Sequence, residues 1–195
     1  MVHEALQIIK DEHQSLAAVL HGLLYLTREI RDRGADPDFR LLHAMLDYIV
    51  AFPQKLHHPK EDQYLFKAIR ERSANAAQLL DELEAEHVRG DDLIRSLQHA
   101  LIGYENEGRD KAELFRKAVE DYADFNWRHM RREEDVVMPL AEQLLTEADW
   151  ERIAAAFRQN DDPLFGIKPK DEFRRLFQRI VALAPPPLGV GPGRP

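Results

Sequence analysis

The sequence predicts an all-α fold, an up-down-up-down four-helix bundle with a C-terminal helical extension. Apolar residues recur at alternating three- and four-residue steps, the period of an amphipathic helix, and no sustained stretch alternates with the period of a strand. Turn signals rich in glycine, proline, serine and aspartate fall near residues 34–37, 72–73 and 107–110. They leave four long helical stretches, and short turns between long helices favour antiparallel packing.

Four long helices are expected before residue 146. Their approximate ranges are 2–33, 38–71, 74–106 and 111–145. Each carries an apolar seam on one side and charged residues on the other, which is typical of a helix that packs one face on a core. In the second helix Pro53 and Pro59 interrupt the backbone hydrogen-bond ladder, so we expect a kink there.

A short helical extension is expected after the bundle. Residues 146–149 read Thr-Glu-Ala-Asp, which has the spacing of a capping box and predicts a fifth helix that ends near residue 159. A sixth amphipathic helix is expected at 170–184, and the Pro- and Gly-rich residues 185–195 are expected to be disordered. The predicted organisation is a bundle at 1–145, an extension at 146–184 and a tail at 185–195.

The extension carries an apolar stripe that needs a surface to cover it. Its residues are Trp150, Ile153, Phe157, Phe173, Leu176, Phe177 and Ile180. Two surfaces would serve. One is the outside of the bundle in the same chain, and the other is a second copy of the chain, which would give a homodimer through the extension.

Composition excludes several classes of site and partner. The 195 residues include 27 Lys and Arg against 35 Asp and Glu, a net charge of −8, which disfavours nucleic acid and membrane surfaces as partners. The absence of cysteine excludes disulfides, thiolate metal sites and iron–sulfur clusters, so a metal ion would need histidine and carboxylate ligands. With no secretory signal and no long apolar stretch, we expect a soluble cytoplasmic protein.

Four histidines occupy positions on the helix seams where apolar residues are expected: His13, His57, His87 and His129. In an antiparallel hairpin, residues equally far from the turn lie side by side. His13 and His57 are equally far from the first turn, His57 and His87 from the second, and His87 and His129 from the third, within the error of placing turns from sequence. The sequence therefore predicts that the four imidazoles meet at one level of the bundle.

Two glutamates join this level. Glu61 follows His57 by four residues and Glu133 follows His129 by four, which puts each carboxylate on the same helix face as its histidine. Burying these polar groups without partners costs several kcal/mol. A pair of metal ions would supply the partners, because imidazole suits iron, zinc, copper and nickel, and carboxylates can bridge two ions.

A simpler interpretation applies to any one of these helices. A single histidine on a seam is more often a core residue with an ordinary hydrogen bond than a metal ligand, and a glutamate one turn later more often faces solvent. Four helices that each place a histidine at the same depth, two of them with glutamate at the right offset, favour the metal site instead.

The segments that carry these residues resemble the hemerythrin-like His-His-Glu cation-binding family. They are Asp11-Glu12-His13, His57-His58-Pro59-Lys60-Glu61-Asp62, Glu86-His87 and His129-Met130-Arg131-Arg132-Glu133-Glu134. The resemblance implies two iron ions joined by carboxylates and an oxo or hydroxo bridge. By position, His13 and His57 would bind one iron, His87 and His129 the other, and Glu61 and Glu133 would bridge them.

Two positions depart from the oxygen-carrying hemerythrins. Those proteins have a second histidine one turn before the third-helix ligand, where this chain has Leu83. They also have an aspartate five residues after the fourth-helix histidine, where this chain has Glu134, so Glu133 is the better bridge. Two hypotheses address the missing ligand at Leu83. Either the ring of His58 binds the iron of His87 and His129, or His58 points along the surface and water fills the position.

The resemblance implies binding of dioxygen or another small diatomic such as nitric oxide, or sensing of oxygen, iron or redox state. We expect a binding protein rather than an enzyme. A ferritin-like di-iron oxidase or peroxidase is an alternative, but it needs Glu-x-x-His on two helices, and only Glu84 and His87 fit. A structural bundle that binds zinc or no metal is a further alternative.

Overall fold

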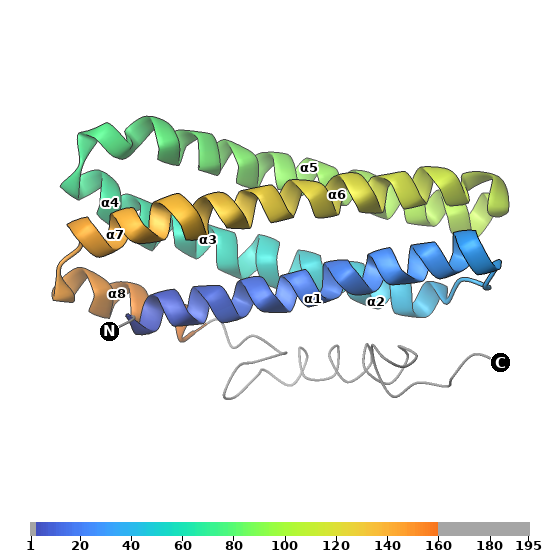
Figure 1. Cartoon of the computed structure of the whole chain (residues 1–195), viewed down its shortest axis with the longest axis horizontal. Coiled ribbons are helices and arrows are strands. Elements are labelled where there is room, and N and C mark those ends of the chain that lie inside the picture. Colours follow the sequence, from blue (N-terminus) through green and yellow to red (C-terminus); the bar gives the residue numbers. More distant parts are fainter. Residues whose placement is uncertain (1–2, 160–195) are drawn as a thin grey trace.

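The computed structural model describes residues 3–159, and these residues form helices and no strands (Figure 1). The predicted all-α bundle is confirmed. The helices are α1 (Glu4–Arg33), α2 (Phe39–Ile49), α3 (His58–Lys60), α4 (Lys67–Arg72), α5 (Ala77–Glu107), α6 (Ala112–Arg132), α7 (Met138–Leu144) and α8 (Glu147–Phe157). The expected helix at 170–184 and tail at 185–195 lie outside the described residues.

The four predicted long helices correspond to α1, the run α2–α4, α5, and the run α6–α7, laid side by side along the bundle (Figure 1). The turn after α1 depends on Gly34, whose φ of 63° lies in the left-handed region that glycine adopts without strain. The helix after this turn is capped by Asp38, whose side chain accepts a hydrogen bond from the backbone N–H of Leu41 at 3.1 Å.

The second long helix continues through Pro53 and Pro59 because its backbone changes there from α-helical to wider π-helical turns. Two π-helical segments, η1 (Val50–His57) and η2 (Glu61–Phe66), flank the three-residue α3. Proline lacks the N–H of the regular ladder, and a π turn re-forms hydrogen bonds over a longer step. The interruption that the sequence predicts at Pro53 and Pro59 thus takes the form of π-helical turns.

A third π-helical segment, η5 (Glu133–Val137), joins α6 to α7, and the sequence did not predict it. It precedes Pro139, which occupies the first turn of α7. Single-turn π segments of this kind are frequent at functional sites. Both η2 and η5 begin at a glutamate that the sequence assigns to the metal layer, Glu61 and Glu133.

The core of the described residues consists of two apolar clusters. The larger cluster contains Leu20, Tyr48, Leu97 and Tyr122 and fills the part of the bundle nearer the α1–α2 turn. The second contains Leu6, Phe66 and Leu80 and fills the other part, where α8 also packs. The polar residues of the predicted layer lie between the clusters, which places them inside the bundle and away from its ends.

Helix α8 folds back onto the bundle (Figure 1). It begins with the predicted capping box, in which the Thr146 side chain accepts from the backbone N–H of Asp149 and the Asp149 carboxylate accepts from the backbone N–H of Thr146. Trp150, Ile153 and Phe157 are buried in the second cluster. The described part of the stripe is thus covered by the bundle itself.

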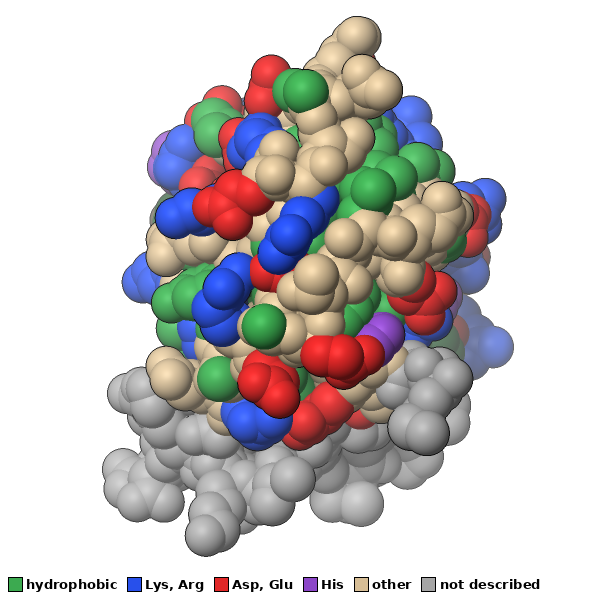
Figure 2. Space-filling model, turned by 90° about the vertical axis from the view of Figure 1, so that its left-hand side faces the viewer, with side chains coloured by type: hydrophobic (Ala, Val, Ile, Leu, Met, Phe, Trp, Pro, Cys, Tyr) green, Lys and Arg blue, Asp and Glu red, His purple; other side chains and the backbone are tan. Residues whose placement is uncertain are grey.

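The bundle end that carries α4, α7 and α8 exposes acidic, basic and apolar side chains interspersed, without a large patch of one charge (Figure 2). Within residues 3–159 no helix combines the length and the apolar character that crossing a membrane requires.

Candidate metal centre

The structure brings the six residues predicted as ligands together in one buried layer. His13 comes from α1, His57 from the end of η1, His87 from α5 and His129 from α6, and none is more than 6% exposed. Glu61 and Glu133 are at most 1% exposed. The antiparallel arrangement that placed the histidines at equal distances from the turns therefore holds in three dimensions.

Each glutamate presents one oxygen to each pair of histidines. For Glu61, Oε1 lies 3.3 Å from Nε2 of His57 and Oε2 lies 3.5 Å from Nε2 of His87. For Glu133, Oε2 lies 3.3 Å from Nε2 of His13 and Oε1 lies 3.2 Å from Nε2 of His129. Carboxylates placed in this way could bridge two ions, one beside His13 and His57 and the other beside His87 and His129.

The inner polar atoms of this layer lack hydrogen-bond partners. Eight buried side-chain nitrogens and oxygens among the described residues have none, and six of these belong to the layer. The six are Nε2 of His13, Nε2 of His57 and both carboxylate oxygens of Glu61 and Glu133. Each such atom would cost about 1–3 kcal/mol if it stayed unpaired. The donor set of imidazole nitrogen and carboxylate oxygen fits a pair of transition-metal ions.

The outer nitrogens of the same four histidines are all engaged by carboxylates. Each Nδ1 faces an acidic side chain from a neighbouring helix, at 2.6–2.9 Å. The pairs are His57 with Glu12, His87 with Asp62, His129 with Glu86, and His13 with Glu134. Each long helix thus supplies the carboxylate for the histidine of the next, and Glu134 closes the ring back to α1.

These four outer carboxylates are candidate functional residues to which the sequence alone assigned no role. Histidine ligands of metals commonly donate their second ring N–H to a carboxylate, which fixes the tautomer and raises the basicity of the ligand nitrogen. A signal was present, because Glu12 and Glu86 directly precede a histidine of the layer, and Asp62 and Glu134 directly follow its glutamates. Which histidine each one binds depends on how the helices are rotated.

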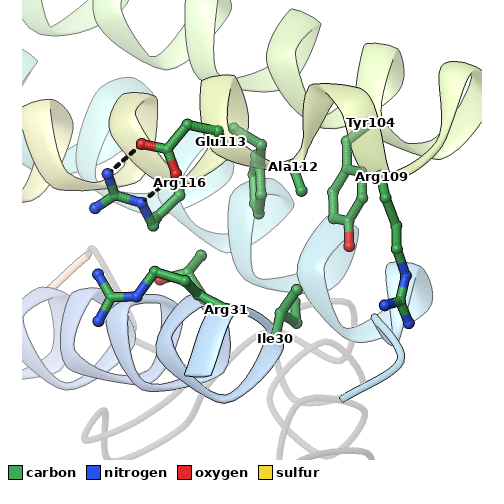
Figure 3. Close-up of a pocket in the computed structure, with 9 residues that line it drawn as sticks. Ile30, Arg31, Tyr104, Arg109, Ala112, Glu113 and Arg116 are labelled. Atoms are coloured by element: carbon green, nitrogen blue, oxygen red, sulfur yellow. Dashed lines mark hydrogen bonds and ion pairs between the residues drawn. The ribbon is translucent and has the colours of Figure 1, made fainter. Parts of the chain in front are cut away.

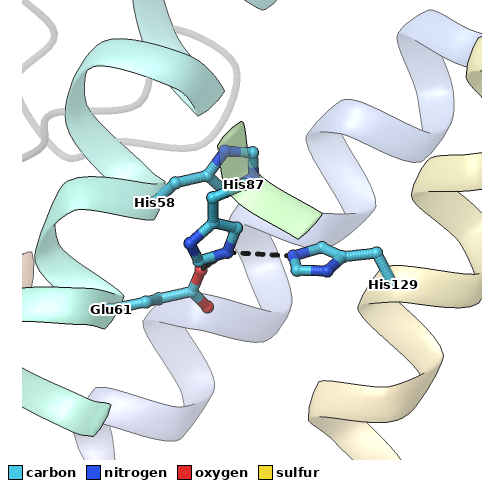
Figure 4. A group of neighbouring side chains, drawn as sticks. All are labelled: His58, Glu61, His87 and His129. Atoms are coloured by element: carbon cyan, nitrogen blue, oxygen red, sulfur yellow. Dashed lines mark hydrogen bonds and ion pairs between the residues drawn. The ribbon is translucent and has the colours of Figure 1, made fainter. Parts of the chain in front are cut away.

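With Nδ1 as the donor to carboxylate, a neutral ring has its lone pair on Nε2, directed into the layer. Nε2 of His87 and Nε2 of His129 lie 3.0 Å apart (Figure 4). Two lone pairs at this distance repel unless a cation lies between them. Either a proton or a metal ion must therefore occupy this point.

The surrounding carboxylates control the charge of the layer. Burial lowers the pKa of His57, but the charge of Glu61 and the hydrogen bond that His57 donates to Glu12 outweigh burial and raise it to about 9. Burial also opposes the charged form of His129, and Glu133 and Glu86 raise its pKa to about 10. Burial raises the pKa of Glu133, but the facing histidines hold it well below its ordinary value. Without metal the layer thus holds imidazolium rings against carboxylates.

His58 lies beside this layer and is buried (Figure 4). One of its ligand atoms lies within 4.8 Å of ligand atoms of Glu61, His87 and His129. Its Nδ1 is 3.1 Å from Oε1 of Gln54, and its ring stacks on His87 with centroids 4.3 Å apart and planes at 9°. Burial and the neighbouring histidines, His87 first among them, hold its pKa well below the ordinary value, so this ring is neutral.

A cavity of about 240 Å³ lies outside the histidine layer, at the end of the bundle near the α1–α2 turn (Figure 3). Tyr104 and Phe115 line it, together with three arginines. Arg116 forms ion pairs with Glu113 and Glu120, and Arg31 binds Asp32, so these charges are already compensated. The histidine layer remains the stronger functional candidate.

Comparison with protein families agrees with this geometry. The family model described as the hemerythrin HHE cation-binding domain matches residues 4–141. No curated protein matches the chain. The matched residues include all four histidines and both glutamates of the layer, as well as the four outer carboxylates. A cation-binding family and a buried set of His and Glu side chains point to the same chemistry, and the chain belongs to the hemerythrin HHE cation-binding family.

Proposed function

We propose that this protein binds two iron ions in the layer and uses them to bind dioxygen or another small diatomic such as nitric oxide. His13 and His57 would hold one ion, His87 and His129 the other, and Glu61 and Glu133 would bridge. The observation that carries the proposal is the orientation of the Glu61 and Glu133 carboxylates. Each places one oxygen beside each histidine pair, at 3.2–3.5 Å from Nε2. When bound, a pair of irons supplies open coordination positions and redox chemistry for a diatomic ligand.

The protein's own residues would orient and insulate such a centre. The four outer carboxylates hold the imidazoles in the tautomer that binds metal. The two apolar clusters on either side of the layer limit the access of water. Glu133 rather than Glu134 faces the inner nitrogens, since Glu134 is engaged by Nδ1 of His13 at 2.8 Å. This supports Glu133 as the bridge.

The stacking of His58 favours a place beside the metal pair over coordination of the ion held by His87. A metal bound by an imidazole lies in the plane of that ring, and two stacked rings with planes at 9° do not share one plane. We therefore propose His58 as a neutral polar neighbour of the ion held by His87 and His129. Its Nδ1 contact with Gln54 holds it there.

The ferritin-like alternative has less support. It needs Glu84 in the layer, but Oε1 of Glu84 accepts a hydrogen bond from Nη1 of Arg70 at 2.6 Å on the outside of the bundle, where its side chain is 35% exposed. A zinc-binding or metal-free bundle would differ from the proposed protein in its metal content, since it would hold zinc or no metal in place of iron.

The test is the visible spectrum of protein purified without added metal. An oxygen-dependent band that reverses on degassing is expected, and a colourless protein that contains zinc would contradict the proposal.

A further inference from the structure

Three of the four outer carboxylates are partly exposed, and one is not. The side chains of Asp62, Glu86 and Glu134 are 32%, 25% and 39% exposed, whereas that of Glu12 is 3% exposed. Glu12 lies between α1 and the second long helix, where it binds Nδ1 of His57 at 2.6 Å. A part of the chain therefore shields Glu12 from solvent and leaves the other three carboxylates partly exposed.

The cover is α8. This helix packs against α1, which carries Glu12, and against η2, which follows His57 in the second long helix. Its last residue, Phe157, is 1% exposed, and its ring centroid lies 6.0 Å from that of His57 with the planes at 79°. Phe157 therefore stands against the imidazole whose Nε2 faces the layer.

Polar contacts hold the C-terminal end of α8 in this place, and a ring stack holds its N-terminal half. Nζ of Lys60, the residue before Glu61, donates to the backbone carbonyl of Ala156 at 2.8 Å. Arg158 binds the carboxylate of Glu4 at 2.8 and 2.9 Å, and the ring of His3 stacks on Trp150 with centroids 4.3 Å apart. The last turn of α8 is thus tied to α3, directly before the π-helical segment that begins at Glu61.

This cover comes from outside the family domain. The family match ends at residue 141, before α8 begins. The bundle itself supplies the aromatic neighbours of two other histidines, Phe66 at 5.8 Å from His87 and Phe125 at 6.3 Å from His129. Of these three histidines, only His57 has a phenylalanine neighbour that comes from the extension.

We propose that Phe157 is the residue that limits the size of the exogenous ligand at the ion held by His13 and His57. The inference rests on the proposed function, because it assumes that an ion is bound there. In this proposal the aromatic ring packed against His57 hinders a three-atom anion such as azide more than a diatomic ligand. A smaller side chain at position 157 opens that space without removing any ligand of the metal.

The test compares azide binding to the iron-loaded full-length chain for wild type, Phe157→Ala and Ile153→Ala, by titration of the visible spectrum. Ile153 is the matched control, since it lies one turn earlier on α8 and is also 1% exposed. The melting temperature of each metal-free protein measures how much either truncation loosens the helix. We expect about tenfold tighter azide binding in Phe157→Ala and an unchanged affinity in Ile153→Ala, with similar losses in melting temperature.

Unchanged azide affinity in Phe157→Ala would overturn the inference. Equal tightening in Ile153→Ala would overturn it too, because loosening of α8 rather than the Phe157 ring would then control access. If Phe157→Ala does not fold, Phe157→Leu takes its place with a smaller tightening expected, and no change would again overturn the inference. A wild-type protein that takes up no iron would instead contradict the proposed function, so the two failures are distinguishable.

Discussion

The carboxylate of Glu134 lies 2.8 Å from Nδ1 of His13 and joins the last long helix of the bundle to the first. With this contact the four outer carboxylates form a closed ring, in which every histidine of the layer is held from a neighbouring helix. The orientation of each ligand therefore depends on the packing of a helix pair and not on its own helix alone.

The outer carboxylates should tune metal affinity. Glu86→Gln removes the charge that binds Nδ1 of His129 and should weaken metal binding about 10–100-fold, because the imidazole becomes a poorer donor. Competition with a chromogenic chelator measures this. Glu105→Gln is the matched control, since Glu105 contacts Nε2 of the partly exposed His43 at 2.8 Å. Equal weakening in both variants would show a general charge effect and contradict the role of the ring.

Substitutions of Glu133 and Glu134 should have different effects on metal content, although the two residues are adjacent in sequence. Glu133→Gln replaces one of the two carboxylate oxygens with an NH2 group, which does not bind a metal ion, so one histidine pair loses its facing oxygen and the protein should lose one or both metal ions. Glu134→Gln leaves the inner oxygens intact and should keep both ions with reduced affinity. Metal content after gel filtration measures the difference. If Glu134→Gln loses metal and Glu133→Gln does not, Glu134 and not Glu133 is the bridging residue.

Metal binding should release protons at neutral pH. Against the effect of burial, Asp62 raises the pKa of His87 to about 9, and Glu133 and Glu86 raise that of His129 to about 10. Their Nε2 atoms lie 3.0 Å apart, so at pH 7 without metal the pair holds at least one proton beyond the neutral form. Only the neutral ring binds metal, so protons must leave. Calorimetry in two buffers of different ionisation enthalpy measures the number released. Equal apparent enthalpies in both buffers at pH 7 would contradict the prediction.

The same pKa shifts predict how the stability of the metal-free protein changes with pH. A histidine whose folded pKa exceeds its unfolded value of about 6.5 stabilises the fold below that value and loses this contribution as pH rises through the folded pKa. The metal-free protein should therefore melt at a lower temperature at pH 10 than at pH 7. Thermal melts monitored by circular dichroism test this, and a higher melting temperature at pH 10 would count against it.

His58 and its neighbour His57 should behave differently on truncation. His57→Ala removes an inner nitrogen and should lower the metal content. His58→Ala should keep both ions, because the ring stacks on His87 and supplies no metal ligand in our proposal. If His58→Ala loses an ion as His57→Ala does, His58 is a ligand and our geometric argument is wrong.

Removal of the extension should destabilise the bundle. A chain truncated after Thr146 exposes the apolar surfaces that Trp150, Ile153 and Phe157 cover in the second cluster. We expect a lower melting temperature and reduced solubility. Melting and solution mass unchanged by the truncation would contradict both the packing seen here and the alternative of a dimer through the extension.

The sequence was sufficient for the helices and the inner layer because both depend on periodicity. Apolar residues at helical steps define each seam, and equal distances from three turns bring His13, His57, His87 and His129 to one level. The i, i+4 spacing is enough to place Glu61 and Glu133 beside two of them.

Three features needed the structure. The ring of outer carboxylates depends on the rotation of neighbouring helices, which sequence spacing does not define, so Glu12 could not be matched to His57 in advance. The π-helical segments arise from a local compromise around proline and the buried glutamates. The contact of Phe157 with His57 also lay beyond prediction, because an amphipathic stripe does not say which surface covers it.

The most direct test of the central claim is the metal content of wild-type protein purified without added metal, measured by inductively coupled plasma mass spectrometry against protein concentration from amino-acid analysis. The orientation of the Glu61 and Glu133 carboxylates predicts two iron ions per chain. A single ion per chain, zinc in place of iron, or no metal at all would contradict the di-iron centre.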